Sequence, residues 1–371
     1  MPSELLYQIA LTQVPMIGDV TIRNLLDHFQ SATAIFQARQ RELERIEQVG
    51  SIKATAIKRF RDFDSAVQEM KFIEKYGVQV IFYGDDNYPI RLKHCADAPS
   101  LLYFKGNSPL HASRMVSIVG TRQPSPYGSK VCVQLVQELC KAGITIVSGL
   151  AYGIDILAHR TAVEKGCPTI GVLAHGLDRI YPPAHMEIAR EMMHCGGLLT
   201  DYRSKTQPDK QNFPRRNRIV AGLTDATIVI ESGLKGGSLI TAELAGGYNR
   251  DVFCIPGHVD DWHASGCHEL IRQHKAVLVT GAADILQAMR WEETAARTGR
   301  VVQSSLFHTL APEEQTIMQL FNNKSRLHLE EIYILSRLSG SQVAAAVFNL
   351  EMQQLLKCLP GQQYEPVSPV S

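Results

Sequence analysis

The feature that most constrains the fold is a long alternation of apolar and amphipathic segments in the middle of the chain. From Val78 onward, short runs rich in β-branched residues alternate with segments whose apolar residues recur at helical spacing. This alternation is typical of a parallel sheet that helices cover on both faces. We therefore predict an α/β fold with a Rossmann-like, doubly wound, mostly parallel sheet for residues 78–292.

The same pattern places the elements of this domain. After a β-rich run from Val78 to Tyr83 and a turn-rich stretch from Asp85 to Pro89, it predicts strands at Met115–Val119, Ile144–Val147, Thr169–Leu173, Gly197–Leu199, Ala226–Ile230, Val252–Ile255 and Val277–Val279. Helices are predicted between them at Gly128–Lys141, Ile154–Lys165, Ala184–Met193, Arg216–Ala221, Leu239–Tyr248, Glu269–His274 and Ala282–Trp291.

In open sheets of this kind, ligands bind beyond the carboxyl ends of the strands, where the connecting loops gather. Several of these loops contain glycines between a strand and a helix, and Arg122 and Lys235 add cations. Glycine lets the backbone approach a phosphate closely, and the helix start that follows offers free N–H groups. We therefore expect a phosphate-bearing ligand at this edge. The loops are Gly120-Thr121-Arg122, Ser148 to Gly153, His175 to Asp178, Phe213 to Arg218 and Gly233 to Ser238.

The segment from Asn212 to Val220 sets one aromatic ring, Phe213, beside three guanidinium groups. A single nucleic-acid strand requires cations along its backbone and a flat apolar surface for its bases. The alternative is a solvated basic helix start with Phe213 packed into the core. The neighbouring glycine loops favour the nucleic-acid interpretation.

Composition limits the remaining possibilities. A chain of 371 residues suggests two or three domains. With 38 Lys and Arg against 37 Asp and Glu, a nucleic-acid site must be a local patch. The first residues lack the basic and apolar run of a signal peptide, and no apolar run is long enough to span a bilayer. The scattered cysteines form no Cys-x-x-Cys pair, which favours a reducing cytoplasm and disfavours a structural zinc. The absence of both a P-loop motif and Gly-x-Gly-x-x-Gly disfavours a P-loop ATPase and an ordinary NAD enzyme.

Shorter modules are predicted on either side of the sheet domain. Residues 1–77 are predicted as helices with glycine hairpins at Val14 to Gly18 and Gln48 to Ile52, which resemble SAM or helix-hairpin-helix modules. Such modules can contact DNA phosphates, but a packing or protein-contact role is at least as well supported. A linker is predicted at 293–311, a winged-helix-like module at 312–365 and a disordered tail at 366–371. The third helix of the winged module has no Lys or Arg between Gly340 and Glu351, which favours protein contact over groove reading.

Taken together, the motifs resemble the DprA/Smf family of DNA-processing proteins. The resemblance rests on Ser117 to Arg122, Ser148 to Asp155 with Ala158-His159, Gly176-Leu177-Asp178 with Tyr181-Pro182, Phe213 to Arg218, Gly237 to Ala242 and Pro256-Gly257. The sequence departs from the family at Thr200-Asp201-Tyr202, where members more often show Ser-Glu and an apolar residue.

The resemblance implies a bacterial cytoplasmic protein without catalytic activity, cofactor or metal. It would bind single-stranded DNA that enters during natural transformation in competent cells, protect it, and help load the RecA recombinase for homologous recombination. It also implies a homodimer formed through the Rossmann-like domain and no membrane association. Carried over by position, the predicted DNA-binding residues are Arg122, Phe213, Arg215, Arg216, Asn217, Arg218, Lys235, Gly120, Thr121, Ser148, Gly149, Gly153, Gly237 and Ser238.

Three other interpretations were weighed. Gly236-Gly237 with Glu243 matches the spacing of a motif in Rossmann-like nucleotide phosphoribohydrolases, which cleave the N-glycosidic bond of nucleoside monophosphates. Lys235 replaces its proline, and Leu239-Ile240 replaces its Gly-Thr, so shared ancestry with lost chemistry is favoured. Asp155 and His159, four residues apart on a helix, could form an acid–base pair, but a structural role is favoured. A metal could lie among residues of the 258–268 stretch, although the spacing fits no common site: His258, His263, Cys267 and His268.

Overall fold

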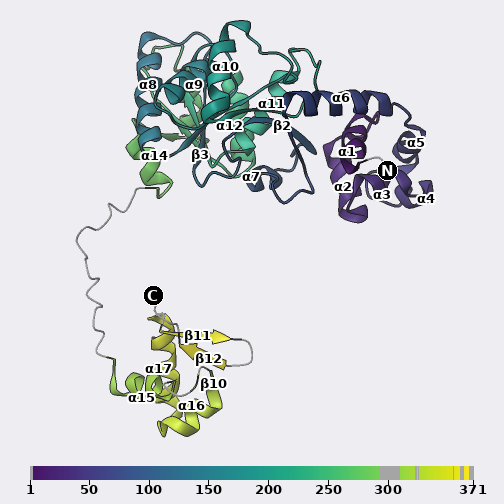
Figure 1. The fold of residues 1–371 in the computed structure, drawn as a ribbon. Helices are drawn as coiled ribbons and strands as arrows, with labels where there is room; N and C mark the ends of the chain where they lie inside the picture. Colours follow the sequence, from purple (N-terminus) through teal and green to yellow (C-terminus); the bar gives the residue numbers. More distant parts are fainter. Residues whose placement is uncertain are drawn as a thin grey trace. The chain divides into compact units, whose positions relative to one another are not determined.

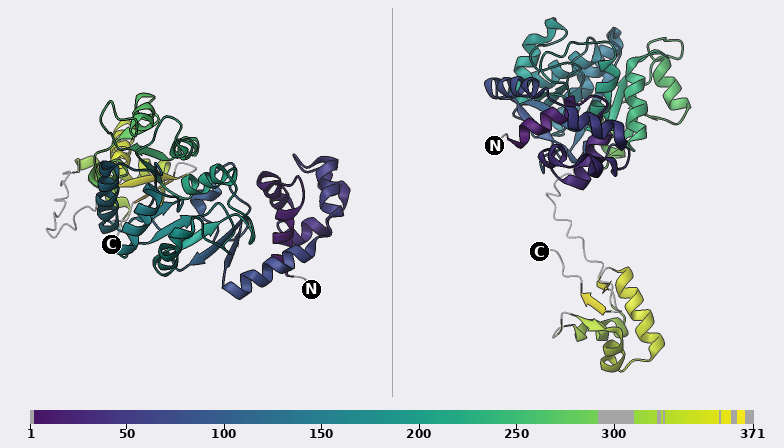
Figure 2. Two further views of the ribbon diagram at one scale, coloured as in Figure 1. Left: turned by 90° about the horizontal axis from the view of Figure 1, so that it is seen from above. Right: turned by 90° about the vertical axis from the view of Figure 1, so that its right-hand side faces the viewer.

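The computed structural model describes residues 3–291, 310–321, 324, 326–353, 355–359 and 363–366. The chain forms two compact units, Met1–Glu292 and Glu293–Ser371 (Figures 1 and 2). The predicted boundary at residues 77 and 78 lies inside the first unit. Most of the predicted linker at 293–311 lies outside the described residues, as does the predicted tail at 366–371 apart from Pro366, which ends a strand. No helix in the described part of the chain is long and apolar enough to cross a membrane.

The first unit begins with a layer of six helices around its own apolar core. Their bounds are α1 Glu4–Gln13, α2 Asp19–Phe29, α3 Ala32–Gln37, α4 Gln40–Glu44, α5 Gly50–Arg59 and α6 Phe63–Tyr76. Two of these helices have N-cap residues whose side chains accept a hydrogen bond from a free backbone N–H: Ser31 before α3 and Asp62 before α6. The predicted hairpin at Val14 to Gly18 falls between α1 and α2, whereas the one at Gln48 to Ile52 runs into the first turn of α5. The long helix α6 leads into the sheet (Figure 1).

The rest of the first unit is built on a nine-stranded sheet in the order β1-β2-β6-β5-β4-β3-β7-β8-β9. Strands β3 to β9 pair in parallel, and β1 and β2, at one end of the sheet, pair antiparallel with their neighbours. Their bounds are β1 Gln79–Phe82, β2 Leu101–Gly106, β3 Met115–Gly120, β4 Thr145–Ser148, β5 Thr169–Val172, β6 Gly197–Thr200, β7 Ala226–Ile230, β8 Asp251–Cys254 and β9 Val277–Leu278. The large, mostly parallel sheet predicted from the sequence is therefore confirmed, although β2 was missed.

Neighbouring residues of a strand point to opposite faces of the sheet. Both faces of the parallel sheet carry apolar residues, and helices cover both. On one face Val119, Val147 and Val229 share a core with Ile219 and Ala242 of α11 and α12. On the other, the intervening residues Ile118, Ile146 and Ile228 pack against residues of α8 and α9. The bounds are α7 Ile90–Lys93, α8 Pro126–Lys141, α9 Ile154–Glu164, η1 Pro183–His185, α10 Met186–Cys195, α11 Asn212–Gly222, α12 Gly237–Gly247, α13 Ser265–Arg272 and α14 Ala282–Ala288.

The strand order reverses once, at β3. The chain steps outward from β3 through β4 and β5 to β6, and then crosses back so that β7 pairs with the other edge of β3. The loops that follow β3 and β7 therefore diverge to opposite faces of the sheet and leave a crevice at the carboxyl ends of these strands. This is the position at which open α/β sheets bind their ligands.

The second unit is described separately. It contains α15 Pro312–Leu320, β10 Leu327–His328, α16 Leu329–Ser336, α17 Gly340–Met352, β11 Leu356–Leu359 and β12 Gln363–Pro366. The strands form an antiparallel sheet in the order β10-β12-β11. Its core includes Ile317, Ile332, Val343 and Leu350. The winged-helix-like identity of residues 312–365 stays a prediction.

Candidate nucleic-acid interface

A pocket of about 690 Å³ opens at the switch point between β3 and β7. The loop after β3, the α11 helix and the turn before α12 form its walls. Its position follows from the strand order alone, because the diverging loops cannot fill the space between them. Residues that line it and were predicted to bind DNA are Gly120, Thr121, Arg122, Gly149, Phe213, Arg216, Asn217, Gly237 and Ser238.

One face of α11 supplies the pocket wall. The lining residues Phe213, Arg216, Asn217 and Val220 are spaced by three and four residues and therefore project from one side of the helix. Arg215 and Arg218 project from another side and line a second depression together with Asp19 and Asp97. Arg216 thus points away from Arg215 and Arg218, although all three are predicted to bind one strand.

The ring of Phe213 is half-buried and held between two neighbours at the mouth of the pocket. The guanidinium carbon of Arg122 lies 5.7 Å from the ring centroid, a cation–π distance, and Arg122 itself is exposed. The ring of Tyr181 lies 6.1 Å away on a tilted plane. Phe213 therefore does not serve as a staple buried in the core. It places a flat apolar ring and an exposed cation side by side.

Arg216 lines the pocket, but its guanidinium bonds to carbonyl oxygens of the protein itself. The residue is only 4% exposed, and its guanidinium donates hydrogen bonds to the carbonyl oxygens of Gly149 and Val172. Burial lowers the pKa of Arg216, and the nearby carboxyl of Asp155 acts in the opposite direction. Both hydrogen bonds come from one terminal nitrogen, Nη1, and the burial of the side chain disfavours the predicted grip of Arg216 on a backbone phosphate.

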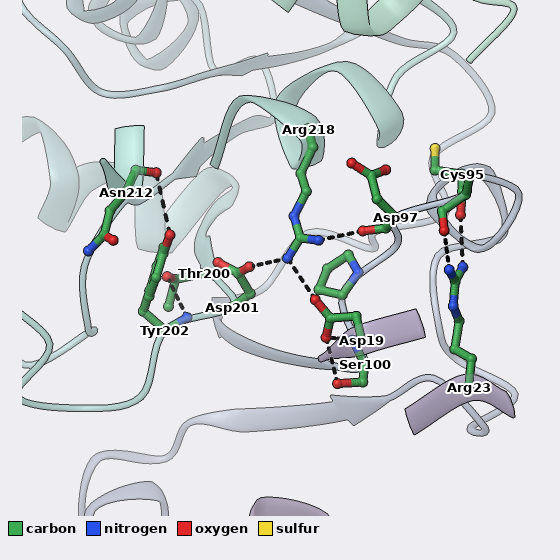
Figure 3. Close-up of polar contacts among 12 residues, drawn as sticks. Asp19, Arg23, Cys95, Asp97, Ser100, Thr200, Asp201, Tyr202, Asn212 and Arg218 are labelled. Atoms are coloured by element: carbon green, nitrogen blue, oxygen red, sulfur yellow. Dashed lines mark hydrogen bonds and ion pairs between the residues drawn. The ribbon is translucent and has the colours of Figure 1, made fainter. Parts of the chain in front are cut away.

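Arg218 is likewise engaged elsewhere, as Figure 3 shows. It forms ion pairs with Asp201 at 2.7 Å and Asp19 at 3.0 Å, and it donates a hydrogen bond to the carbonyl of Asp97. Burial acts to lower the pKa of Arg218, but the two carboxylates outweigh it and the net direction is upward. Its predicted place in the strand-binding pocket is therefore wrong. Asp201, which departs from the family pattern, is one of the partners that hold it.

Ser148 and two of the loop glycines also have structural roles. The Ser148 hydroxyl is fully buried and donates to the carbonyl of Ile118, 2.6 Å away, so its predicted contact with phosphate is wrong. A Cβ on Gly149 would lie 2.5 Å from the Arg216 guanidinium. Gly153 has φ +80°, and a Cβ there would lie 2.2 Å from the carbonyl oxygen of Thr121. These glycines are required because other segments of the same chain pack closely against them. Gly153 does not line the pocket.

The pocket also contains residues that the list of predicted contacts omits. Lys210 and Tyr181 both line it, and Lys210 is exposed. Lys210 comes three residues before Phe213, within the acid-poor stretch, so the charge pattern could have indicated it. Tyr181 lies outside the acid-poor stretch, and the signal for it was its place in the Tyr181-Pro182 motif of the family resemblance. Lys235 and Arg215 are exposed but lie outside the residues that line this pocket.

Of the residues in the enzyme interpretations, Asp155 lines the pocket, whereas Glu243 and His159 do not. Glu243 lies outside the lining, and its 62% exposed side chain is 3.5 Å from the Lys275 ammonium. Asp155 accepts a hydrogen bond from the Gly149 N–H, and His159 is buried against the Thr169 hydroxyl. Burial lowers the pKa of His159 to about 3. Among the described residues, no three His, Cys, Asp or Glu side chains gather as a metal site would require.

The fold and the pocket place the chain in the class of open α/β-sheet proteins with a ligand pocket at the topological switch point. More narrowly, the chain belongs to the DprA/Smf family, since residues 79–290 match the family DNA recombination-mediator protein A. It is 31% identical over 394 residues to Protein Smf of Synechocystis, an alignment that covers 98% of this chain and 99% of that protein.

Two solved structures are similar. The X-ray structure of DNA processing protein A from Streptococcus pneumoniae has a TM-score of 0.67 at 33% identity and covers 77% of this chain and 98% of that one. DNA processing protein A from Helicobacter pylori, whose structure was described for its single-stranded DNA binding mode, has a TM-score of 0.53 at 31% identity. That similarity covers 58% of this chain and 96% of the other.

Proposed function

We propose that this protein binds single-stranded DNA in the pocket between β3 and β7. The observation that carries the proposal is the exposed Arg122 guanidinium set 5.7 Å from the centre of the half-buried Phe213 ring. A single strand presents a phosphate and an unpaired base to such a surface, and aromatic stacking tolerates any base. A duplex keeps its bases paired and cannot place them on a recessed ring, so we expect weaker binding to duplex DNA.

Further cations and backbone groups extend the interface. Lys210 lines the same pocket, and Lys235 lies exposed on the turn before α12. The start of α12 contributes the Gly237 and Ser238 backbone N–H groups, where the helix dipole favours an anion. These groups concentrate positive charge in and beside the pocket, in a chain whose net charge is only +1. We expect strand binding to weaken steeply with salt for this reason.

We propose, from membership of the DprA/Smf family, that bound DNA is the strand taken up in natural transformation. The protein would shield that strand in the cytoplasm and help load the RecA recombinase on it without a catalytic reaction of its own. A homodimer would add avidity, because two pockets could engage one long strand. The N-terminal helices would form a SAM-like module and the C-terminal unit a winged-helix-like module. For the latter we propose protein contact, since α17 lacks basic residues.

Fluorescence anisotropy with the full chain tests the proposal. Labelled single-stranded and duplex oligonucleotides of equal length are titrated at several salt concentrations. We expect tighter binding to the single strand and a marked loss of affinity in Arg122→Gln. Equal affinity for duplex and single strand, or parent-like binding by Arg122→Gln, would remove the basis for the proposal.

A further inference from the structure

The N-terminal helices contact the chain segment that builds one wall of the pocket. This segment, residues 201–218, runs from the end of β6 into α11 and carries both Lys210 and Phe213. Two carboxylates of the N-terminal helices hold it at separate points, Asp19 of α2 and Glu69 of α6. Neither carboxylate lines the pocket.

The first contact is centred on Asp19, as Figure 3 shows. One oxygen of its carboxylate accepts hydrogen bonds from the Ser100 N–H at 2.8 Å and hydroxyl at 2.7 Å. The other oxygen is 3.0 Å from the guanidinium of Arg218, which also binds Asp201. Arg23, one helical turn after Asp19, donates to the carbonyl oxygens of Cys95 and Ala96. One face of α2 is thus fixed both to the 95–100 loop and to α11.

The second contact is centred on Glu69, which is only 4% exposed. Its carboxylate accepts hydrogen bonds from the Ser204 N–H at 2.9 Å and from the Ser204 hydroxyl at 2.5 Å. Nearby, the Arg203 guanidinium donates to the Ser65 hydroxyl at 2.9 Å. A buried carboxylate with two donors is costly to separate from them, so this end of the segment is held firmly.

Lys210 and Phe213 lie in the sequence between these two anchors at Ser204 and Arg218. We propose that the N-terminal helices set the affinity of the pocket for single-stranded DNA by fixing this segment, and that Asp19 and Glu69 are positioning residues. The inference rests on the proposed function and deepens it. It assigns Arg218 a mechanical role in place of the phosphate contact expected from the sequence.

The same contacts argue against DNA binding at the start of α2. A helix-hairpin-helix module would offer the backbone N–H groups at this helix start to phosphate. Here the first residue of α2, Asp19, is a carboxylate that would repel phosphate, and it is engaged with Ser100 and Arg218. The helix start therefore serves packing against the sheet domain.

The test compares Asp19→Asn and Glu69→Gln with the parent in the full chain. Both variants keep side-chain size and remove a charge that does not face the pocket. We expect each to weaken single-strand binding by about ten-fold, within the range typical of coupled sites. The slope of log affinity against log salt should not change, because no phosphate contact is lost. Hydrogen exchange of backbone amides in residues 201–218 should be faster in both variants than in the parent. Asp19→Glu, which keeps the carboxylate, should bind single-stranded DNA more tightly than Asp19→Asn.

Asp27→Asn is the matched control, because Asp27 is an exposed carboxylate on the same helix. It should bind like the parent. Parent-like binding by both Asp19→Asn and Glu69→Gln, while Arg122→Gln binds poorly, would overturn the inference and leave the proposed function intact. Parent-like binding by Arg122→Gln would instead count against the proposed function. A reduced salt slope in Asp19→Asn or Glu69→Gln would also overturn the inference, since it would reveal a lost phosphate contact.

Discussion

The pair Arg122 and Phe213 makes a prediction with two separable signatures. Arg122 is exposed and can pair with a phosphate, whereas the Phe213 ring is half-buried between Arg122 and Tyr181 and can receive one base. Replacing Phe213 by Leu keeps an apolar side chain but removes the flat ring. Replacing Arg122 by Gln keeps most of the length of the side chain but removes its charge.

The magnitudes follow from these roles. One stacked base contributes about 1–3 kcal/mol, so Phe213→Leu should weaken binding by roughly five- to a hundred-fold. Its salt dependence should stay that of the parent. Arg122→Gln should reduce the slope of log affinity against log salt by about 0.7, the value for one phosphate contact of a single strand. The Arg122→Gln variant should also lose the cation–π attraction between residue 122 and the Phe213 ring, about 0.5–1 kcal/mol.

Anisotropy titrations of a short single-stranded oligonucleotide at four salt concentrations measure both quantities. Tyr76→Leu serves as the control, because Tyr76 is a 46% exposed aromatic residue outside the pocket lining. The reasoning is refuted if Phe213→Leu flattens the salt dependence or binds as tightly as the parent. It is also refuted if Arg122→Gln leaves the slope unchanged.

Three further predictions concern stability and chemistry. Burial lowers the pKa of His159 to about 3, so the unfolded chain binds a proton at a higher pH than the folded chain does. The free energy of unfolding should therefore fall as pH drops from about 6.5 towards 3, by up to about 1.4 kcal/mol per pH unit. Denaturant titrations of His159→Asn should show a flatter dependence on pH. Gly153→Ala should lower the free energy of unfolding by at least about 1 kcal/mol, and by more than Gly143→Ala does. Both glycines have positive φ, but only Gly153 is crowded by neighbouring atoms. Thermal melts compare the two variants, and equal losses would contradict the crowding argument. Incubation of the parent with nucleoside monophosphates should release no free base by chromatography, whereas release that disappears in Glu243→Gln would support the phosphoribohydrolase interpretation.

The sequence predicts the parallel sheet well because its strands are buried on both faces. A run such as Ala226 to Ile230 is buried throughout and mostly apolar, and its ends are set by the turn residues that flank it. The first four residues of strand β2, Leu101–Gly106, are also buried, yet the strand lies after a turn-rich stretch and joins the antiparallel end of the sheet. Nothing in the alternation of strands and helices requires a strand there, so tertiary packing alone reveals it.

The site is predicted less completely, for the reason that motif residues serve two purposes. Gly149 and Gly153 were assigned to phosphate contact because glycine permits close approach, but the groups that approach them are Arg216 and the Thr121 carbonyl. Sequence alone cannot tell which atom comes close. The general location of the pocket was predictable, since strand order and loop position determine it.

The arginines of α11 show which part of that error was avoidable. Successive residues of an α-helix are rotated by about 100°, so Arg215, Arg216 and Arg218 cannot share a face. The apolar spacing predicts a start of this helix at Arg216, whereas α11 begins at Asn212. With the helix extended to Asn212, Phe213 and Arg216 fall on the pocket side and Arg218 on the other. Of the two, Arg216 is buried by the sheet and Arg218 is held by Asp19 and Asp201. The cations left to meet a phosphate in the pocket are therefore Arg122 and Lys210, which come from the loops and not from the helix.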